Sequence, residues 1–186
     1  MTEQTAVLEG TATYDIDPAH SEVGFTVRHM GFSKVRGRFE RYSGQIRLQP
    51  DTLSSLEVEV DIEAASISTD EEKRDEHLRT NDFLDAQNHE TITFKSTGPR
   101  DANAHTFELE GDLTIRGVTK AIVLEGTYLG EGTDPWGGSR VGFEASTVIN
   151  RKDFGVNWNT VLESGGFLVG ENVEIELNVQ AVRSDD

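Results

Sequence analysis

The feature that most constrains this chain is a strict alternation of apolar and polar residues along many segments. Residues 57–63, 107–116 and 173–180 each place apolar side chains or a glycine at every second position, with acidic or other polar residues between them. Successive side chains of a β-strand point to opposite faces, so this pattern predicts strands with one buried and one solvated face. Such strands are typical of antiparallel sheets. The chain is therefore predicted to be all-β and antiparallel.

The number of these segments leaves two architectures open. Eight or nine of them follow one another, separated by turn residues such as those at 98–101 and 130–138. About eight strands either close into a barrel or stack as two sheets. Alternation over ten or more residues favours the long tilted strands of a barrel but does not exclude a sandwich. No repeat or composition shift divides the 186 residues, which predicts one domain.

One segment, residues 69–79, breaks the alternation. Thr69 followed by Glu72 matches a capping box, and the acidic residues around Glu72 suit the positive end of a helix dipole. We therefore predict a short helix at about residues 70–79. Leu78 is its only large apolar side chain, so we expect the helix to lie across one end of the sheet and not inside the core.

Composition excludes several classes of protein. The chain has no Cys, which rules out disulfides, thiol catalysis, zinc ribbons and iron–sulfur clusters. A net charge of −17 argues against nucleic acid or an anionic membrane as a partner of the whole molecule. No stretch approaches the roughly 18 apolar residues of a spanning helix, so we expect no membrane insertion. No secretory signal is visible, which predicts a cytoplasmic protein, or a periplasmic or secreted one if an export signal was removed.

Neither a catalytic motif nor a metal motif is visible. The apolar faces of the predicted strands supply hardly any carboxylate, His or Lys, and the common nucleotide, hydrolase and metalloprotease signatures are absent. The histidines show no zinc-ligand spacing, so we expect neither a metal nor a cofactor; they are His20, His29, His77, His89 and His105. The apolar faces predict either a cavity for a long apolar molecule or simply a packed core.

Basic residues gather in one segment of this acidic chain. Residues 28–47 hold six basic residues and one acidic residue, whereas the remaining residues hold 11 basic and 33 acidic ones. Two interpretations remain open. Arginine forks suit phosphate or carboxylate recognition, and the same side chains suit cross-strand pairing with the acidic residues at 57–63 or 174–176. The basic residues are Arg28, Lys34, Arg36, Arg38, Arg41 and Arg47.

An ordered set of motifs resembles the YceI-like family of lipocalin-like, polyisoprenoid-binding proteins. The opening of that family is similar to residues 14–30 (YDIDPAHSEVGFTVRHM) and 35–39 (VRGRF). Its central and later signatures resemble residues 66–69 (SIST), 74–78 (RDEHL), 82–85 (DFLD), 111–120 (GDLTIRGVTK) and 153–156 (DFGV). The resemblance covers residues 11–183, leaving residues 1–10 as an N-terminal extension and residues 184–186 as a C-terminal tail.

The resemblance implies an extended antiparallel, lipocalin-like β-barrel of about eight strands whose interior binds an isoprenoid lipid such as a polyprenyl phosphate or a quinone. It implies no established catalytic activity, and it favours a homodimer. The expected tunnel residues are Phe25, Val27, Phe39, Val60, Ile62, Phe94, Phe107, Leu109, Phe143 and Val173. The expected contacts to a polar head are His29, Arg36, Arg74 and His77.

A catalytic alternative uses some of the same residues. In this hypothesis the protein is an enzyme acting on a lipid or a small apolar substrate, with His77 and Asp75 or His29 transferring a proton near the barrel mouth. The two hypotheses differ in one structural respect, because catalysis requires these side chains to meet and to face the cavity.

Overall fold

Strands make up most of the chain, which is seen here in a computed structural model that describes residues 10–49 and 51–184. The predicted extension and tail, residues 1–10 and 184–186, lie outside the described residues except for Gly10 and Ser184. The strands are β1 Ala12–Ile16, β2 Glu22–His29, β3 Ser33–Phe39, β4 Tyr42–Gln49, β5 Thr52–Glu63, β6 Ile67–Ser68, β7 Thr91–Ala102, β8 Thr106–Ile115, β9 Val118–Thr133, β10 Ser139–Asn150 and β11 Val169–Arg183. The helices are α1 Glu72–Arg79 and the short 3-10 turns η1 Pro18–His20, η2 Ala64–Ser66 and η3 Arg151–Phe154.

Eight of the strands close a barrel. Hydrogen-bonded neighbours follow the order β1–β4–β5–β7–β8–β9–β10–β11, and β11 returns to β1 through three residue pairs, among them Ile16 with Ala181. Toward the other end of β11, β2 and not β1 is its hydrogen-bonded neighbour. The wall continues from β2 to β3 and from β3 to β6. The prediction of a closed antiparallel barrel is confirmed, and the sandwich is wrong.

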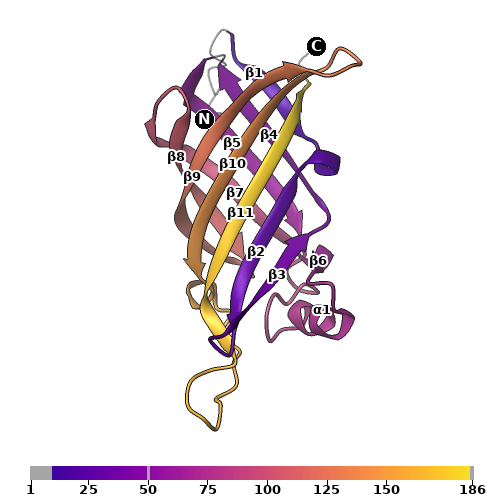
Figure 1. The fold of residues 1–186 in the computed structure, drawn as a ribbon, viewed down its shortest axis with the longest axis vertical. Helices are drawn as coiled ribbons and strands as arrows, with labels where there is room; N and C mark the ends of the chain where they lie inside the picture. The colour runs from indigo at the N-terminus through magenta and orange to yellow at the C-terminus, as the bar shows by residue number, and fades with distance from the viewer. Residues whose placement is uncertain (1–9, 50, 185–186) are drawn as a thin grey trace, which may run out of the picture.

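The barrel has two distinct ends (Figure 1). The upper end, as drawn, carries the β9–β10 turn. The lower end carries the β2–β3 turn, α1 and the long loop 155–168 that leads into β11. The short helix thus lies beside one end of the barrel, as predicted.

The start of α1 differs from the prediction. The N-cap is Glu71, whose carboxylate accepts a hydrogen bond from the Arg74 backbone N–H at 2.7 Å. Thr69 does not cap the helix, because its backbone N–H and its hydroxyl both donate to the buried Asp75 carboxylate, at 2.8 and 2.6 Å. The predicted capping box is therefore wrong: Asp75 satisfies Thr69 from inside the helix, and the helix begins later.

Phenylalanine rings rest on glycines inside the barrel wall. Phe107 of β8 lies directly opposite Gly126 of β9, and Phe25 of β2 lies directly opposite Gly37 of β3. A Cβ atom added at either glycine would overlap the facing ring. Cross-strand contact of this kind stabilises a sheet position that glycine alone would weaken. The glycines thus leave space for the rings to lie against the neighbouring strand.

Replacing Gly126 with Ala is predicted to destabilise the barrel. The added methyl group must displace the Phe107 ring, which costs about 1–3 kcal/mol for overpacking in a core. Gly132→Ala in the same strand is the matched control, because no atom lies within 4 Å of the added Cβ there. Urea unfolding of both variants measures the difference in the free energy of unfolding, and equal stabilities would contradict the packing argument.

A polar network ties the upper end together. The Arg140 guanidinium donates to Asp17 at 2.8 Å, to Asp134 at 2.9 Å and to the Gln180 side chain at 2.8 Å. These partners belong to the N-cap of η1, the β9–β10 turn and β11. The hydrogen bond from Arg140, assisted by His20, lowers the pKa of Asp17 to about 2.

Acid is predicted to remove the stabilisation that Arg140 provides. The folded pKa of Asp17 lies below its usual value of about 3.9, so the stabilisation is complete above about pH 4 and is lost as the pH falls toward 2. Arg140→Met is expected to lower the urea midpoint at neutral pH. The difference in urea midpoint between this variant and the unsubstituted protein should become smaller as the pH falls from about 4 to about 2. Arg100→Met, at an exposed arginine, is the control. A difference independent of pH would contradict the assignment.

Candidate functional site

A cavity of about 240 Å³ runs inside the barrel and is lined almost entirely by hydrophobic side chains. Among its described lining residues, Arg151 is the one charged side chain. The cavity is larger than the roughly 150 Å³ apolar cavity that accepts benzene in an engineered core. Burial raises the pKa of the lining residue Tyr42 above its usual value, as expected beside a dry space. The inner face can hold an apolar ligand.

The interior is hollow along β11 and packed at the upper end. Inward-facing Val173, Ile175 and Leu177 are only half-buried, although they point away from the outer surface. By contrast, Val141 and Ala181, which pair across β10 and β11 at the upper end, are 2% and 0% exposed. A solid core would bury both sets equally. The sequence left open whether the interior is a cavity or a packed core. The structure has a cavity, which ends below a packed upper end.

The lower end of the cavity is lined by segments outside the long strands. Leu78 of α1, Phe83 and Leu84 of the following turn, and Phe154 and Val156 near η3 all contribute to its wall. These residues carry no sequence signal for a place on the wall, because no period of two or 3.6 assigns a face in short irregular segments. The cavity therefore extends from the packed upper end toward α1 and loop 155–168.

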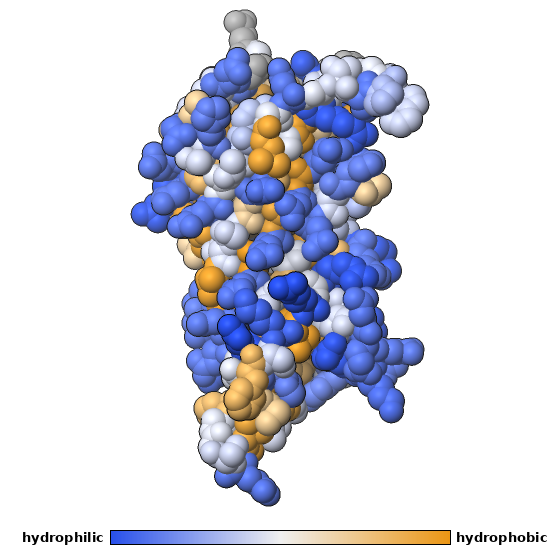
Figure 2. Space-filling model, viewed as in Figure 1, coloured by the Kyte–Doolittle hydropathy of each residue, from blue (hydrophilic) through white to orange (hydrophobic). Residues whose placement is uncertain are grey.

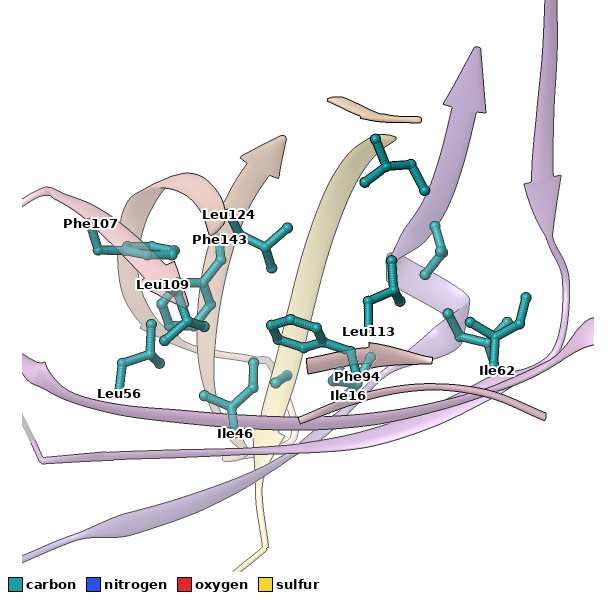
Figure 3. Packing of buried hydrophobic residues seen from close by; sticks show 14 of the residues in the cluster. Ile16, Ile46, Leu56, Ile62, Phe94, Phe107, Leu109, Leu113, Leu124 and Phe143 are labelled. Carbon is teal, nitrogen blue, oxygen red and sulfur yellow. The ribbon is translucent and has the colours of Figure 1, made fainter. Parts of the chain in front are cut away.

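All ten expected tunnel residues lie on the cavity wall. They come from β2, β3, β5, β7, β8, β10 and β11. Figure 3 shows several of them, with Phe94, Phe107 and Phe143 projecting into the space that the strands enclose. Their positions follow from the alternation, since each occupies an inward-facing strand position. The expected residues are Phe25, Val27, Phe39, Val60, Ile62, Phe94, Phe107, Leu109, Phe143 and Val173.

The four expected head contacts do not come together in the cavity, and none of them belongs to its lining. Arg36 is exposed and alternates with the inward Val35 and Gly37 of β3, so it faces outward. His29 is exposed at the end of β2. Arg74 donates to the Thr69 hydroxyl at 2.6 Å and to the Thr69 carbonyl at 2.9 Å, which ties α1 to the segment before it.

His77 lies nearest to the cavity of the four. Its Nε2 atom is 2.8 Å from the Asp82 carboxylate, and its ring meets the edges of Phe83 and Trp158 at centroid distances of 5.1 and 4.7 Å. Phe83 is itself a lining residue. Asp75 is buried and accepts two hydrogen bonds from Thr69, so the described hydrogen bonds of His77 and Asp75 do not join them as a proton-transfer pair.

The basic segment divides into two groups. Arg41 and Arg47 pair with Glu63 at 2.7 Å and Glu57 at 3.1 Å, as the cross-strand interpretation expected. Arg38 instead pairs at 3.1 Å with Asp70, which lies outside the acidic segments expected. Arg28, Lys34 and Arg36 are exposed and form no ion pair with any residue in 10–49 or 51–184.

Arg151 of η3 is a structural residue that the sequence analysis missed. It is 5% exposed, and its guanidinium donates to the carbonyls of Val156, Trp158, Val169 and Gly170 at 2.8–3.3 Å. Burial lowers its pKa from the usual value, and Glu171 acts in the opposite direction. Arg151 therefore holds both ends of loop 155–168 against the lower barrel. A lone arginine after a strand gives no sequence signal for this role.

Neither a metal site nor a spanning helix is seen in the described part of the chain. Within residues 10–49 and 51–184, no three or more His, Cys, Asp or Glu side chains are arranged to hold a metal ion. The helices there are too short and too polar to cross a membrane.

Comparisons with known proteins agree with this architecture. The model of the YceI-like domain family matches residues 14–181. A UPF0312 protein of Vibrio cholerae is 37% identical over 174 residues, which cover 92% of this chain and 88% of that protein. Among solved structures, Burkholderia cenocepacia BcnA superposes with a TM-score of 0.77 at 22% identity, over 89% of this chain and 98% of BcnA. A polyisoprenoid-binding domain from Saccharophagus degradans superposes with a TM-score of 0.67 at 15% identity, over 93% and 99% of the two chains.

Substituting Arg151 with Lys is predicted to loosen loop 155–168. Lysine keeps the charge but cannot reach four separate carbonyls, so buried acceptors lose their donors at a cost of roughly 2–4 kcal/mol. Urea unfolding gives the loss in stability, and hydrogen exchange of amides in residues 156–170 should accelerate first. Arg36→Lys, at an exposed arginine, is the matched control and should change neither. Unchanged exchange in Arg151→Lys would contradict the clamp.

Proposed function

Because the chain belongs to the YceI-like domain family, we propose that it binds a long apolar isoprenoid-type lipid inside the barrel and transports or stores it. A polyprenyl phosphate or a quinone has the required chemistry. The observation that carries this proposal is the cavity: it is enclosed by strands, lined by hydrophobic side chains and hollow along β11. The polyisoprenoid-binding domain with a similar fold supports the same class of ligand.

Hydrophobic burial supplies the binding energy in this proposal. Removing apolar surface from water contributes roughly 5 kcal/mol for each 200 Å², at about 25 cal/mol per Å². Association and ordering of a flexible chain oppose this by several kcal/mol. A ligand with repeated apolar units can exceed that cost without any charged contact, which fits a wall that offers hardly any polar group.

The proposed role is binding and not chemistry. Arg151 is the one charged side chain among the described residues of the cavity wall, and backbone carbonyls engage its guanidinium. General acid–base catalysis needs a titratable side chain within hydrogen-bond reach of the substrate. The ligand is therefore expected to leave the barrel unchanged.

The polar head of the ligand belongs at the lower end in this proposal. Leu78 and Phe83 line the cavity there, and His77 lies beside Phe83 and Trp158. His77 is about two-fifths exposed and holds Asp82, so it can meet a polar group that emerges from the cavity. Of the four expected head contacts, His77 is the one that the proposal keeps.

Filling the cavity is predicted to abolish ligand retention. Ala145 points inward from the middle of β10 and lines the cavity, so Ala145→Trp places an indole where the ligand would lie. Ser146 is its outward-facing neighbour, and Ser146→Trp adds the same side chain to the outer face. Mass spectrometry of organic extracts from natively purified protein should show a stoichiometric isoprenoid or quinone in the unsubstituted protein and in Ser146→Trp.

Ala145→Trp should lose at least about 90% of this ligand, because a displaced apolar chain forfeits more than 1.4 kcal/mol of burial. Circular dichroism and urea unfolding check that both variants fold. Equal ligand content in the two folded variants would reject the cavity as the binding site. Extracts of the unsubstituted protein without any isoprenoid or quinone would reject the proposed ligand class.

A further inference from the structure

Large hydrophobic side chains are exposed at the lower end of the barrel. Phe32, Val161 and Phe167 are 81%, 72% and 52% exposed, and Met30 is 39% exposed. Figure 2 shows an apolar patch at this end of a surface that is otherwise mostly polar. We refer to Met30, Phe32, Val161 and Phe167 as the lower tip. Contiguous exposed apolar side chains with a polar rim mark an interaction surface.

The two segments that carry the lower tip are joined to each other and to the barrel. The Met30 backbone N–H donates to the Leu168 carbonyl at 2.8 Å, which links the β2–β3 turn to the end of loop 155–168. Within that loop, Val161 and Phe167 form a β-bridge. Asn159 bonds the Val169 backbone through both side-chain atoms, at 2.7 and 3.0 Å, and Arg151 clamps the base. The lower tip is thus presented by a connected scaffold.

Unpaired cations stand beside the lower tip. Arg28, Lys34 and Arg36, here termed the cationic strip, are exposed on neighbouring strands and form no ion pair within residues 10–49 and 51–184. Arg28 and Lys34 lie directly opposite each other in the β2–β3 ladder, and Arg28 donates to the Phe32 carbonyl at 3.0 Å. Like charges in direct opposition destabilise a sheet, so an anionic partner would relieve the strip.

Basic residues prevail in the two segments that carry the lower tip, although α1 at the same end contributes Glu72 and Glu76. The Lys152 Nζ atom lies over the Phe167 ring, 5.9 Å from its centroid, and pairs with the Glu171 carboxylate at 2.6 Å. The charges of Lys152 and Glu171 therefore compensate each other. Glu163 is the one acidic residue within residues 155–168. Charges farther than about 8 Å are largely screened at physiological ionic strength. The net charge of −17 therefore does not decide what this end of the molecule binds.

We infer that the lower end of the barrel docks on an anionic lipid bilayer, with the lower tip entering the interface and the cationic strip contacting lipid head groups. This combination of apolar side chains and adjacent basic residues is what interfacial binding requires. In this arrangement the protein contacts only the interfacial region of the bilayer and does not span it. It also rests on the proposed function in one respect, because the same end carries the residues that line the lower part of the cavity. Docking there brings the cavity toward the source of an apolar ligand.

Vesicle flotation of the full chain tests this inference. The probes are vesicles of phosphatidylcholine alone and vesicles of phosphatidylcholine with an equal amount of phosphatidylglycerol. The protein should float with the mixed vesicles, less with phosphatidylcholine alone, and less as salt is added. Arg36→Gln should lower the partition coefficient roughly fivefold, and Phe32→Ser with Phe167→Ser should lower it at least about tenfold.

Matched controls come from the upper end. Trp136 is 87% exposed in the β9–β10 turn, so Trp136→Ser removes an equally exposed aromatic side chain far from the lower tip. Arg100→Gln removes the same charge as Arg36→Gln from β7. Neither control should change flotation. Equal flotation with both vesicle types, or a loss in the controls as large as in the test variants, would overturn the inference.

A second readout separates docking from ligand binding. The chain has two tryptophans, so in a Trp136→Ser background Trp158 alone reports on quenching by a soluble quinone. Phe32→Ser with Phe167→Ser should keep the same quinone affinity in solution while losing flotation. Loss of both together would overturn the inference, because the lower tip would then be part of the cavity. Absence of quenching before any change at the lower tip would count against the proposed function, whatever the flotation shows.

Discussion

The return of β11 to β1 is the constraint on which the rest of this structure depends. A hydrophobic interior can stay hollow only if the backbone around it satisfies its own hydrogen bonds, because an open sheet edge facing an apolar space would leave donors and acceptors unpaired. Three residue pairs between β1 and β11 complete the ring of eight strands. With the ring closed, the inward side chains need only meet one another or a ligand. The apolar cavity is thus a consequence of closure.

The two ends of the barrel differ because different segments fill them. Strand residues such as Val141 and Ala181 meet and close the upper end, where the Arg140 network also fixes the turns. The lower end is built from α1, η3 and loop 155–168, which are held by side chains bonding to the backbone, above all Arg151. Packing between strand residues therefore fills the upper end, whereas hydrogen bonds from side chains to the backbone hold the segments of the lower end.

Much of the fold could be predicted from the sequence, because the period of a strand assigns each residue to a face. This is why every expected tunnel residue lies on the cavity wall, and why residues such as Val60 and Phe94 needed no further signal. The contacts of the polar residues were harder to predict, because the partner of a charged side chain depends on which distant segments the fold brings together. Thr69 resembles a helix cap in the sequence, but in the structure its backbone N–H and its hydroxyl both donate to Asp75. Arg36 and Arg41 looked alike in sequence, yet Arg41 meets Glu63 and Arg36 has no such partner among the described residues.

The packed upper end has a consequence for any chain molecule that occupies the cavity. A tube sealed at one end sets a depth as well as a width, because the first units to enter come to rest against the seal and the remaining units stay outside. Two ligands with the same repeating unit but different lengths would then share identical contacts at depth and differ only in what protrudes beside α1. The depth of the barrel would then determine how many units of the chain are enclosed, and moving the packed upper end by one layer of side chains would change that number.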